Sequence, residues 1–496
     1  MLISIDRRSE TPIYLQISNA LIRAIRRGQL SRGSKLPGTE QLSAALGVNR
    51  KTLQTAYDEL MAQGWIDIFS RKGAFVATAT PELSPKALTA GAGMGPYPSN
   101  ISYPLAVETA AKFPESVSLE SRNLVLDGGL PDVRLAPVAE LIREYRVLSK
   151  RKTMAKYLKY GEPAGSRYLI ETLAEFLRET RALPISEENL MITRGAQMAF
   201  HIAARLLLKP GDHVVVGAPG YTNIDGLFRL LGAIIDRIPV DGFGIDIDSL
   251  DSLCRKVTPR IVYVLPHHHY PTNVTLIPER RIRLLELAVR HRFAIIEDDF
   301  DYDFEYDSGP FLPMASLDDH GSVIYVGTLA KTVFPSMRVG FLVAPINLIQ
   351  AAVQIRRSID LQGDSMMEAA IAELYRHGTM KAHIRKAVKI YRERRDHMSA
   401  LLRGAFGDRI SFGVPTGGMG FWAQFPGSDL DRVAQIAYAN GLTMSDRLVF
   451  NPGTDSPDWA RLGFASLNLS EQKTAIGILK DSVMKAERMR GRRSTR

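Results

Sequence analysis

The chain has 496 residues, which is too long for one typical domain and predicts two or three. Its hydrophobic fraction of 45% suffices for large buried cores. The single cysteine, Cys254, excludes an internal disulfide framework and fits a reducing cytoplasm. No signal peptide precedes Ile3 and no apolar run approaches the length of a membrane span, so we expect a cytoplasmic protein. The net charge of +10 permits nucleic-acid binding without proving it.

Residues 1–77 follow the order helix, short helix, turn, helix and hairpin. The first helix opens after Thr11, and the others are expected at 39–46 and 50–62, followed by a strand-turn-strand from 65 to 77. This is the order of a winged helix-turn-helix, in which the third helix enters the major groove and the hairpin tip touches phosphate. The predicted DNA contacts are Asn49, Arg50, Lys51 and Thr52 on the helix and Arg71 and Lys72 on the tip.

The charge of this segment suits DNA, because residues 1–80 hold eleven Lys and Arg against six Asp and Glu. A small helical dimerisation domain with a basic surface is the alternative. The motifs Gly33-Ser-Lys-Leu-Pro37, Leu42-Ser-Ala-Ala-Leu-Gly-Val48 and Ala56-Tyr-Asp-Glu-Leu60 resemble the GntR-type winged helix. Glu40 departs from that family, which usually has an arginine near the DNA backbone, and a glutamate there would repel phosphate.

A stretch rich in Pro, Gly, Ala and Ser follows, and we expect residues 78–124 to be a linker. From there to about residue 485 helices alternate with short apolar runs, which predicts an α/β domain with a mostly parallel sheet. Residues 486–496 form a basic tail. The expected elements of the domain are helices at 170–180, 197–208 and 279–290 and strands at 213–216, 234–240, 261–265, 293–298, 323–326 and 339–343.

Lys331 lies in a tight connection between two of these apolar runs, with Thr328 and Arg338 on either side. A partly desolvated lysine can form a Schiff base with an aldehyde, and an arginine suits phosphate. The three residues suggest pyridoxal phosphate, although a surface-loop lysine is the plain alternative. Asp298 ends a buried strand, where it could pair with the pyridine nitrogen of that cofactor.

Other residues could complete such a site. The amides of Gly195, Ala196 and Gln197 open a helix and form an anion site, and Tyr221 follows a strand and could cover a ring. Arg461 lies on a late strand and could bind a ligand carboxylate, or form an ion pair on the surface.

Two interpretations as a metal site are weaker. The acidic residues around Asp298 could bind a cation, but we favour none, and the run from His267 to His269 reads as a loop at the sheet edge because its side chains alternate in direction.

The motifs of residues 125–485 resemble, in order, those of fold-type I aminotransferases. They include Tyr160-Gly-Glu-Pro-Ala-Gly165, Leu208-Lys-Pro-Gly-Asp212, Tyr270-Pro-Thr-Asn273 and Gly327-Thr-Leu-Ala-Lys331. With the GntR-like segment before them, the whole chain resembles MocR/GabR-type transcriptional regulators. The resemblance implies that Lys331 holds the cofactor, Asp298 its pyridine nitrogen, Tyr221 its ring, and Arg461 the ligand carboxylate. Thr328, Arg338 and the amides from Gly195 to Gln197 would hold the phosphate.

The resemblance also implies a head-to-tail homodimer on double-stranded operator DNA. We therefore expect a regulator that senses an amine, an amino acid or the cofactor itself, with a residual aminotransferase half-reaction at most. Phe300 replaces the usual tyrosine that meets the cofactor's 3′-oxygen, and Asn273 replaces a glycine. The alternatives are a working aminotransferase with an accessory DNA-binding head, and a repressor whose body no longer holds the cofactor.

Overall fold

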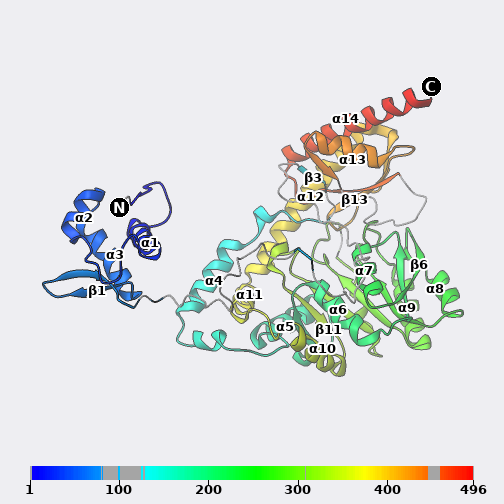
Figure 1. The fold of residues 1–496 in the computed structure, drawn as a ribbon. Helices are drawn as coiled ribbons and strands as arrows, with labels where there is room; N and C mark the ends of the chain where they lie inside the picture. The colour runs from blue at the N-terminus through cyan, green and yellow to red at the C-terminus, as the bar shows by residue number, and fades with distance from the viewer. Residues whose placement is uncertain are drawn as a thin grey trace. The chain divides into compact units, whose positions relative to one another are not determined.

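The computed structural model describes residues 3–79, 81, 99–100, 124–126, 129–307, 309–444 and 458–494. The chain divides into two compact units, residues 1–105 and 106–496, which are called the head and the body below (Figure 1). Most of the expected linker lies outside the described residues. Among the described helices, none is long and apolar enough to cross a membrane.

The head consists of three helices and a two-stranded antiparallel hairpin. These elements are α1 (Ile13–Arg26), α2 (Thr39–Leu46), α3 (Arg50–Ala62), β1 (Ile66–Phe69) and β2 (Gly73–Val76). They enclose one core, to which α1 contributes Leu21, α3 contributes Leu53 and the start of the hairpin contributes Trp65. Gly47, at φ 62°, ends α2 in the left-handed conformation, which glycine adopts without steric cost. The predicted winged helix-turn-helix is confirmed, with each element within two residues of its expected limits.

The body is organised around an eight-stranded sheet in which β10, β9, β8, β5 and β6 run parallel and β11 and β7 run antiparallel to their neighbours. In spatial order the strands are β4 (Leu190–Thr193), β11 (Gly340–Val343), β10 (Val323–Thr328), β9 (Ala294–Asp299), β8 (Pro259–Val264), β5 (His213–Ala218), β6 (Ile234–Asp241) and β7 (Gly244–Ile245). The expected α/β class with a mostly parallel sheet is therefore confirmed.

Helices cover both faces of this sheet, and successive strand residues point to opposite faces. Val214 and Val216 pack with α6 (Ala196–Leu207), α7 (Thr222–Leu230) and α10 (Ile346–Ile359). Val215, between them, packs on the other face with α8 (Ile247–Cys254) and α9 (Pro278–His291). Near β11 that second face is covered by α4 (Val138–Lys150), α5 (Arg167–Arg181) and α11 (Ser365–Arg376). Burial on both faces explains why these strands read as unbroken apolar runs.

The remaining elements, the long α12 among them, form a smaller subdomain with its own core (Figure 1). An antiparallel sheet in the order β12-β13-β15 packs against three helices, and β3 pairs in parallel with β14. These elements are β3 (Leu124–Leu126), α12 (Thr379–Phe406), β12 (Ser411–Phe412), β13 (Gly420–Gln424), α13 (Leu430–Ala439), β14 (Leu442–Met444), β15 (Trp459–Gly463) and α14 (Leu469–Ser494). Helix α14 therefore extends into the stretch expected to be a basic tail.

Candidate cofactor site and DNA-binding face

The residues expected to hold the cofactor lie mostly where parallel strands of the large sheet end. Asp298 is near the end of β9, Thr328 ends β10, and Tyr221 follows β5. Lys331 comes three residues after β10, between the buried side chains of Leu329 and Val333. In a parallel sheet the carboxyl ends of the strands meet at one edge, which is where ligands bind in such folds.

The ammonium group of Lys331 points back across this edge. Its Nζ donates to the backbone oxygen of Gly129 at 2.6 Å, and the side chain is half-buried. The positive charge of Lys331 also lowers the pKa of Asp298, against the larger effect of burial. The loop that carries the lysine is held by two backbone hydrogen bonds, from Leu329 to Val339 and from Val333 to Leu329. Lys331 is therefore a half-buried loop lysine that lies close enough to Asp298 to affect its pKa.

Asp298 is buried and only half satisfied. Its Oδ2 accepts a hydrogen bond of 2.5 Å from the hydroxyl of Tyr263 on β8. Its Oδ1 is buried without a hydrogen-bond partner among the described residues. Burial raises the pKa of Asp298 to about 7. A buried carboxylate oxygen without a donor is costly, and a protonated pyridine nitrogen would supply both the donor and the positive charge.

The neighbouring carboxylates turn to other partners. Glu297 accepts the backbone N–H groups of Met314 and Ala315, Asp299 accepts the hydroxyl of Tyr325, and Asp301 pairs with His268. In the described parts of the chain, no three His, Cys, Asp or Glu side chains are grouped as a metal site. The acidic run therefore serves several separate contacts in the body.

Two of the groups expected to hold a phosphate, Gly195 and Arg338, meet at the start of α6. Gly195, at φ 76°, precedes the helix, and Arg338 donates from Nη2 to the backbone oxygen of Arg194 at 3.2 Å. A Cβ atom added to Gly195 would stand only 2.8 Å from that Nη2 atom. Glycine is thus required for the guanidinium to lie against the helix N-terminus, where backbone N–H groups favour an anion. Thr328 is also expected to contact the phosphate. Its hydroxyl accepts a hydrogen bond of 3.1 Å from the backbone N–H of Ala330.

Tyr221 and Arg461 are joined through Tyr270. The rings of Tyr221 and Tyr270 meet edge to face at 5.6 Å, and the guanidinium of Arg461 lies 4.8 Å from the centre of the Tyr270 ring. Arg461, on β15 of the subdomain, is only 1% exposed. The fold thereby brings an arginine that is distant in sequence to this aromatic pair. The alternative prediction, that Arg461 forms an ion pair on the surface, is wrong because the side chain is buried.

Asn273 holds this arginine, a role that was not predicted from the sequence. Its Oδ1 accepts from Nη1 of Arg461 at 2.7 Å, and its Nδ2 donates to the backbone oxygen of Gly420 on β13. The same Nη1 also donates to the backbone oxygen of Pro271. Asn273 has φ 60°, a conformation that asparagine tolerates better than most residues. Its departure from the family's glycine was the available signal.

Phe300 packs beside the core cluster under α6 and α7. Tyr302 and Tyr270 are two tyrosines that could supply the hydroxyl that Phe300 lacks. The ring of Tyr302 lies against Arg181 at 4.3 Å and His267 at 4.7 Å, whereas Tyr270 touches both Tyr221 and Arg461. Of the two, Tyr270 is the one gathered with the candidate site.

The three consecutive histidines have separate partners, as expected from their alternating directions, but all are buried. His267 contacts the backbone oxygen of Phe311, and His269 contacts the hydroxyl of Thr272 at 3.1 Å. His268 contacts Asp301 at 2.7 Å and Glu305 at 3.2 Å, and its pKa is raised to about 10 against the opposing effect of burial. The loop at the sheet edge is thus packed inside the body.

On the head, the expected DNA contacts form an exposed polar surface. Arg50 and Lys51 open α3, and Arg71 and Lys72 form the tip between β1 and β2; all four are exposed. Among the described residues, none forms an ion pair with these four side chains. Asn49 instead caps α3, since its Oδ1 accepts the N–H of Lys51 at 2.8 Å. Glu40 is exposed in the first turn of α2.

Comparison with known proteins supports both units. Residues 129–479 match the family "Aminotransferase class I and II", and residues 13–76 match "Bacterial regulatory proteins, gntR family". The chain is 28% identical over 492 residues to the probable rhizopine catabolism regulatory protein MocR of Rhizobium meliloti, covering 97% of this chain and 96% of that protein. It is 32% identical over 359 residues to aromatic-amino-acid aminotransferase 1 of Thermococcus litoralis, covering 71% and 85%.

Among solved structures, the kynurenine aminotransferase of Pyrococcus horikoshii, in complex with PMP, matches with 30% identity and a TM-score of 0.69. The match covers 74% of this chain and 92% of that one. The body and the head thus each have their own relatives, and the MocR protein matches both together. The chain belongs to the class I and II aminotransferase family and, through its gntR-family head, to the MocR-type transcriptional regulators.

Proposed function

We propose that this regulator binds pyridoxal 5′-phosphate in its body and senses an amine or amino-acid effector, or the cofactor itself, through that site. The observation that carries the proposal is the buried, unpartnered Oδ1 of Asp298 on the same sheet edge as Lys331. A cofactor that offers a protonated ring nitrogen would satisfy this oxygen. The kynurenine aminotransferase relative, solved with PMP, supports the assignment.

The bound cofactor would supply an aldehyde for an amine and a ring that accepts electrons. Lys331 would hold it, and would release it when an effector amine takes the lysine's place. Asp298 would keep a proton on the ring nitrogen, because a carboxylate in a buried site strongly favours a neighbouring positive charge. Arg338, Thr328 and the amides of Gly195, Ala196 and Gln197 would bind the phosphate, and Tyr221 would cover the ring.

Arg461 would bind the effector carboxylate. Its Nη1 is engaged by Asn273 and Pro271, so the guanidinium is held in a fixed orientation behind the Tyr221 and Tyr270 rings. A fixed fork of donors selects a carboxylate over a neutral group. This supports an amino acid over a simple amine as the effector.

Sensing rather than turnover is supported by Phe300, which cannot donate a hydrogen bond to the cofactor. A working aminotransferase with an accessory head is the alternative, supported by the relative from Thermococcus litoralis. The two differ in one measurement. Steady transfer of amino groups to a 2-oxo acid at ordinary enzymatic rates would favour the enzyme.

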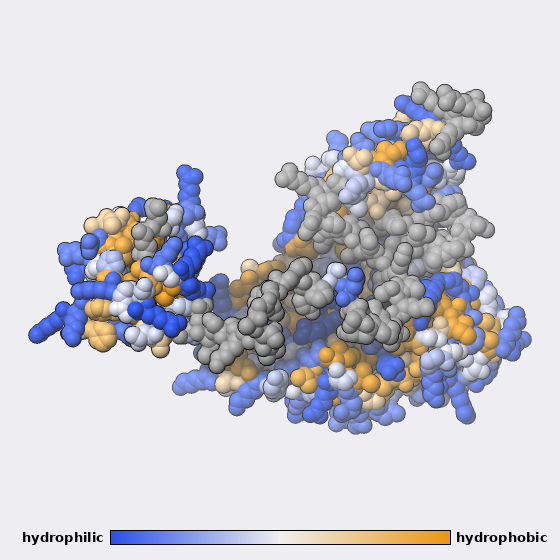
Figure 2. All heavy atoms as spheres, in the orientation of Figure 1, coloured by the Kyte–Doolittle hydropathy of each residue, from blue (hydrophilic) through white to orange (hydrophobic). Residues whose placement is uncertain are grey.

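The regulator would act in the cytoplasm as a head-to-tail homodimer on operator DNA. Apolar side chains exposed on the body favour a partner subunit, since Leu158 is 67% and Tyr160 is 88% exposed. Figure 2 shows hydrophobic side chains gathered among hydrophilic ones on the face of the body that it presents. An effector can shift the output only by binding two conformations unequally.

The test compares Lys331→Ala with Lys381→Ala. Lys381 is exposed and pairs with Glu179 on the surface, so its replacement controls for a lost lysine charge. We expect amino acids to change the visible absorbance of the bound cofactor and the promoter output in the wild type and in Lys381→Ala, but not in Lys331→Ala. Effector-dependent promoter output that survives in Lys331→Ala would refute the proposed sensing mechanism.

A further inference from the structure

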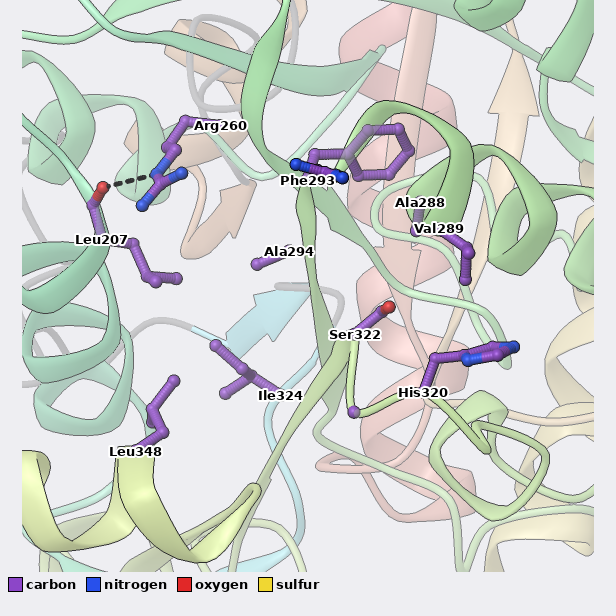
Figure 3. Close-up of a pocket in the computed structure, with 12 residues that line it drawn as sticks. Leu207, Arg260, Ala288, Val289, Phe293, Ala294, His320, Ser322, Ile324 and Leu348 are labelled. Carbon is purple, nitrogen blue, oxygen red and sulfur yellow. Dashed lines mark hydrogen bonds between the residues drawn. The ribbon is translucent and has the colours of Figure 1, made fainter.

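An open pocket of about 450 Å³ lies at the edge of the large sheet where β8, β9 and β10 begin. Figure 3 shows Arg260 and Leu207 on one side of it, His320 on the other, and Ala294 and Ile324 between them. The candidate cofactor residues Asp298 on β9 and Thr328 on β10 lie at the opposite ends of these strands. The pocket is therefore separate from the candidate cofactor site.

The titratable side chains that line this pocket are all basic. Arg260 on β8, Arg292 at the end of α9 and His320 in the turn before β10 contribute to the lining, which contains no carboxylate. The nearby Asp318 is turned toward the backbone, because it accepts the N–H groups of His320 and Val323. The pocket therefore offers a positive rim without a built-in counterion.

The two arginines have donors to spare. Arg260 uses Nε to donate to the backbone oxygen of Leu207 at 3.0 Å. Among the described residues, neither its two Nη atoms nor the guanidinium of Arg292 has a hydrogen-bond or ion-pair partner. A cation at the end of a helix is favoured by the helix dipole, and α6 and α9 both end here. The helix dipole explains why arginines stand at these positions. The Nη atoms of Arg260 and the guanidinium of Arg292 still line the pocket with donors that a ligand could use.

The floor of the pocket is apolar. Leu207, Ile324 and Leu348 lie together at one side of it, with Ala294 above them (Figure 3). Apolar surface beside a few convergent polar groups is the usual composition of a small-molecule site, and the volume lies in the ordinary range for one. An inorganic anion would leave this apolar floor uncovered.

We propose that this pocket binds a small organic anion that has one carboxylate on a compact apolar body, such as an aromatic monocarboxylate. The carboxylate lies between Arg260 and Arg292, which can each donate two hydrogen bonds to it. The apolar body covers Ile324 and Leu348 and is thereby removed from water. The pocket is a second small-molecule site of the body, independent of cofactor binding.

The test titrates 4-fluorobenzoate into the full-length protein and follows its fluorine resonance by NMR. We expect saturable binding that the double variant Arg260→Gln/Arg292→Gln weakens at least about tenfold, since charge-assisted hydrogen bonds are the strong ones. Ser322→Asp, which adds a negative charge to the lining, should weaken binding similarly without removing either arginine. Arg283→Gln is the matched control, because Arg283 lies on α9 outside the lining and pairs with Asp248.

Two further arms identify the site. Inorganic phosphate should compete poorly, because it cannot cover the apolar floor, and benzyl alcohol should bind poorly, because it lacks the charge. Arg461→Lys should leave the 4-fluorobenzoate affinity unchanged. No saturable binding by the wild type, or binding that Arg461→Lys weakens while the pocket variants do not, would overturn the proposal.

Discussion

Replacing Asn273 tests how the candidate carboxylate site is built. Asn273→Gly removes two hydrogen bonds, one from Arg461 and one to Gly420. A lost hydrogen bond to a buried charged group costs about 1.5–3 kcal/mol. Glycine relieves the strain of φ 60° and returns about 1 kcal/mol. The neutral hydrogen bond to Gly420 adds about 0.5–1.5 kcal/mol, so we expect the body to lose about 1–3.5 kcal/mol of unfolding free energy, with the bond from Arg461 to Pro271 retained.

Asn273→Asp should act differently, because aspartate also tolerates this backbone conformation. Its carboxylate would lie beside Arg461 and compete with the carboxylate of an effector. We expect effector affinity to fall at least about tenfold, while the new ion pair with Arg461 offsets the loss of the hydrogen bond to Gly420, which a carboxylate cannot donate. Cofactor affinity should change little in either variant, since the hydrogen bonds of Asn273 reach neither Lys331 nor Asp298.

The assay combines urea unfolding with titration of the bound cofactor's absorbance by amino acids. We expect Asn273→Gly to be less stable and Asn273→Asp to bind effectors more weakly, with cofactor loading unchanged in both. If Asn273→Gly were as stable as the wild type and Asn273→Asp bound effectors equally well, the contact with Arg461 would have no role in the site.

Three other outcomes are expected. The pKa of Asp298 is raised to about 7, so the folded cofactor-free protein binds this proton more tightly than the unfolded chain does. The melting temperature of the cofactor-free protein should therefore fall as the pH rises toward 8. Asp298→Asn should remove part of that fall. Gly195→Ala should weaken cofactor binding at least about tenfold by displacing Arg338, whereas Gly211→Ala, with φ 91° but no atom within 4 Å of the added Cβ, should not; fluorescence titration compares them. Glu40→Arg should strengthen operator binding and steepen its salt dependence by about one phosphate contact, measured by gel shift at several salt concentrations.

The local structure of this chain was predictable wherever burial repeats regularly along the sequence. Strands buried on both faces gave apolar runs, such as Val214 to Val216, and α3 followed from its apolar spacing, whereas the cap formed by Asn49 was not predicted. Asp298 and Lys331 could be proposed as site residues because Asp298 lies at the end of such a run and Lys331 lies between two of them.

The contacts between distant segments were not predictable. The bond between Asn273 and Arg461 joins residues 188 positions apart, and it depends on how the subdomain sits on the large sheet. The contact between Tyr270 and Arg461 likewise depends on the position of β15, which carries the arginine to the tyrosine ring. The basic pocket at the opposite sheet edge is assembled from five separate stretches, with Arg260, Arg292 and His320 each unremarkable in its own sequence context.

A sensor and an enzyme on this fold differ in what must happen after the ligand carboxylate is bound. An enzyme must stabilise a transition state and then release product, so its gains lie in contacts formed only during reaction. A sensor needs only unequal binding to two conformations. Arg461 lies on the subdomain, yet its Nη1 is tied to Asn273 and Pro271, which follow β8 of the large sheet. An effector carboxylate that competes for this guanidinium would alter the connection between subdomain and sheet. That coupling requires no turnover. Effector binding would then be transmitted through the contact between Asn273 and Arg461, which the Asn273 variants test.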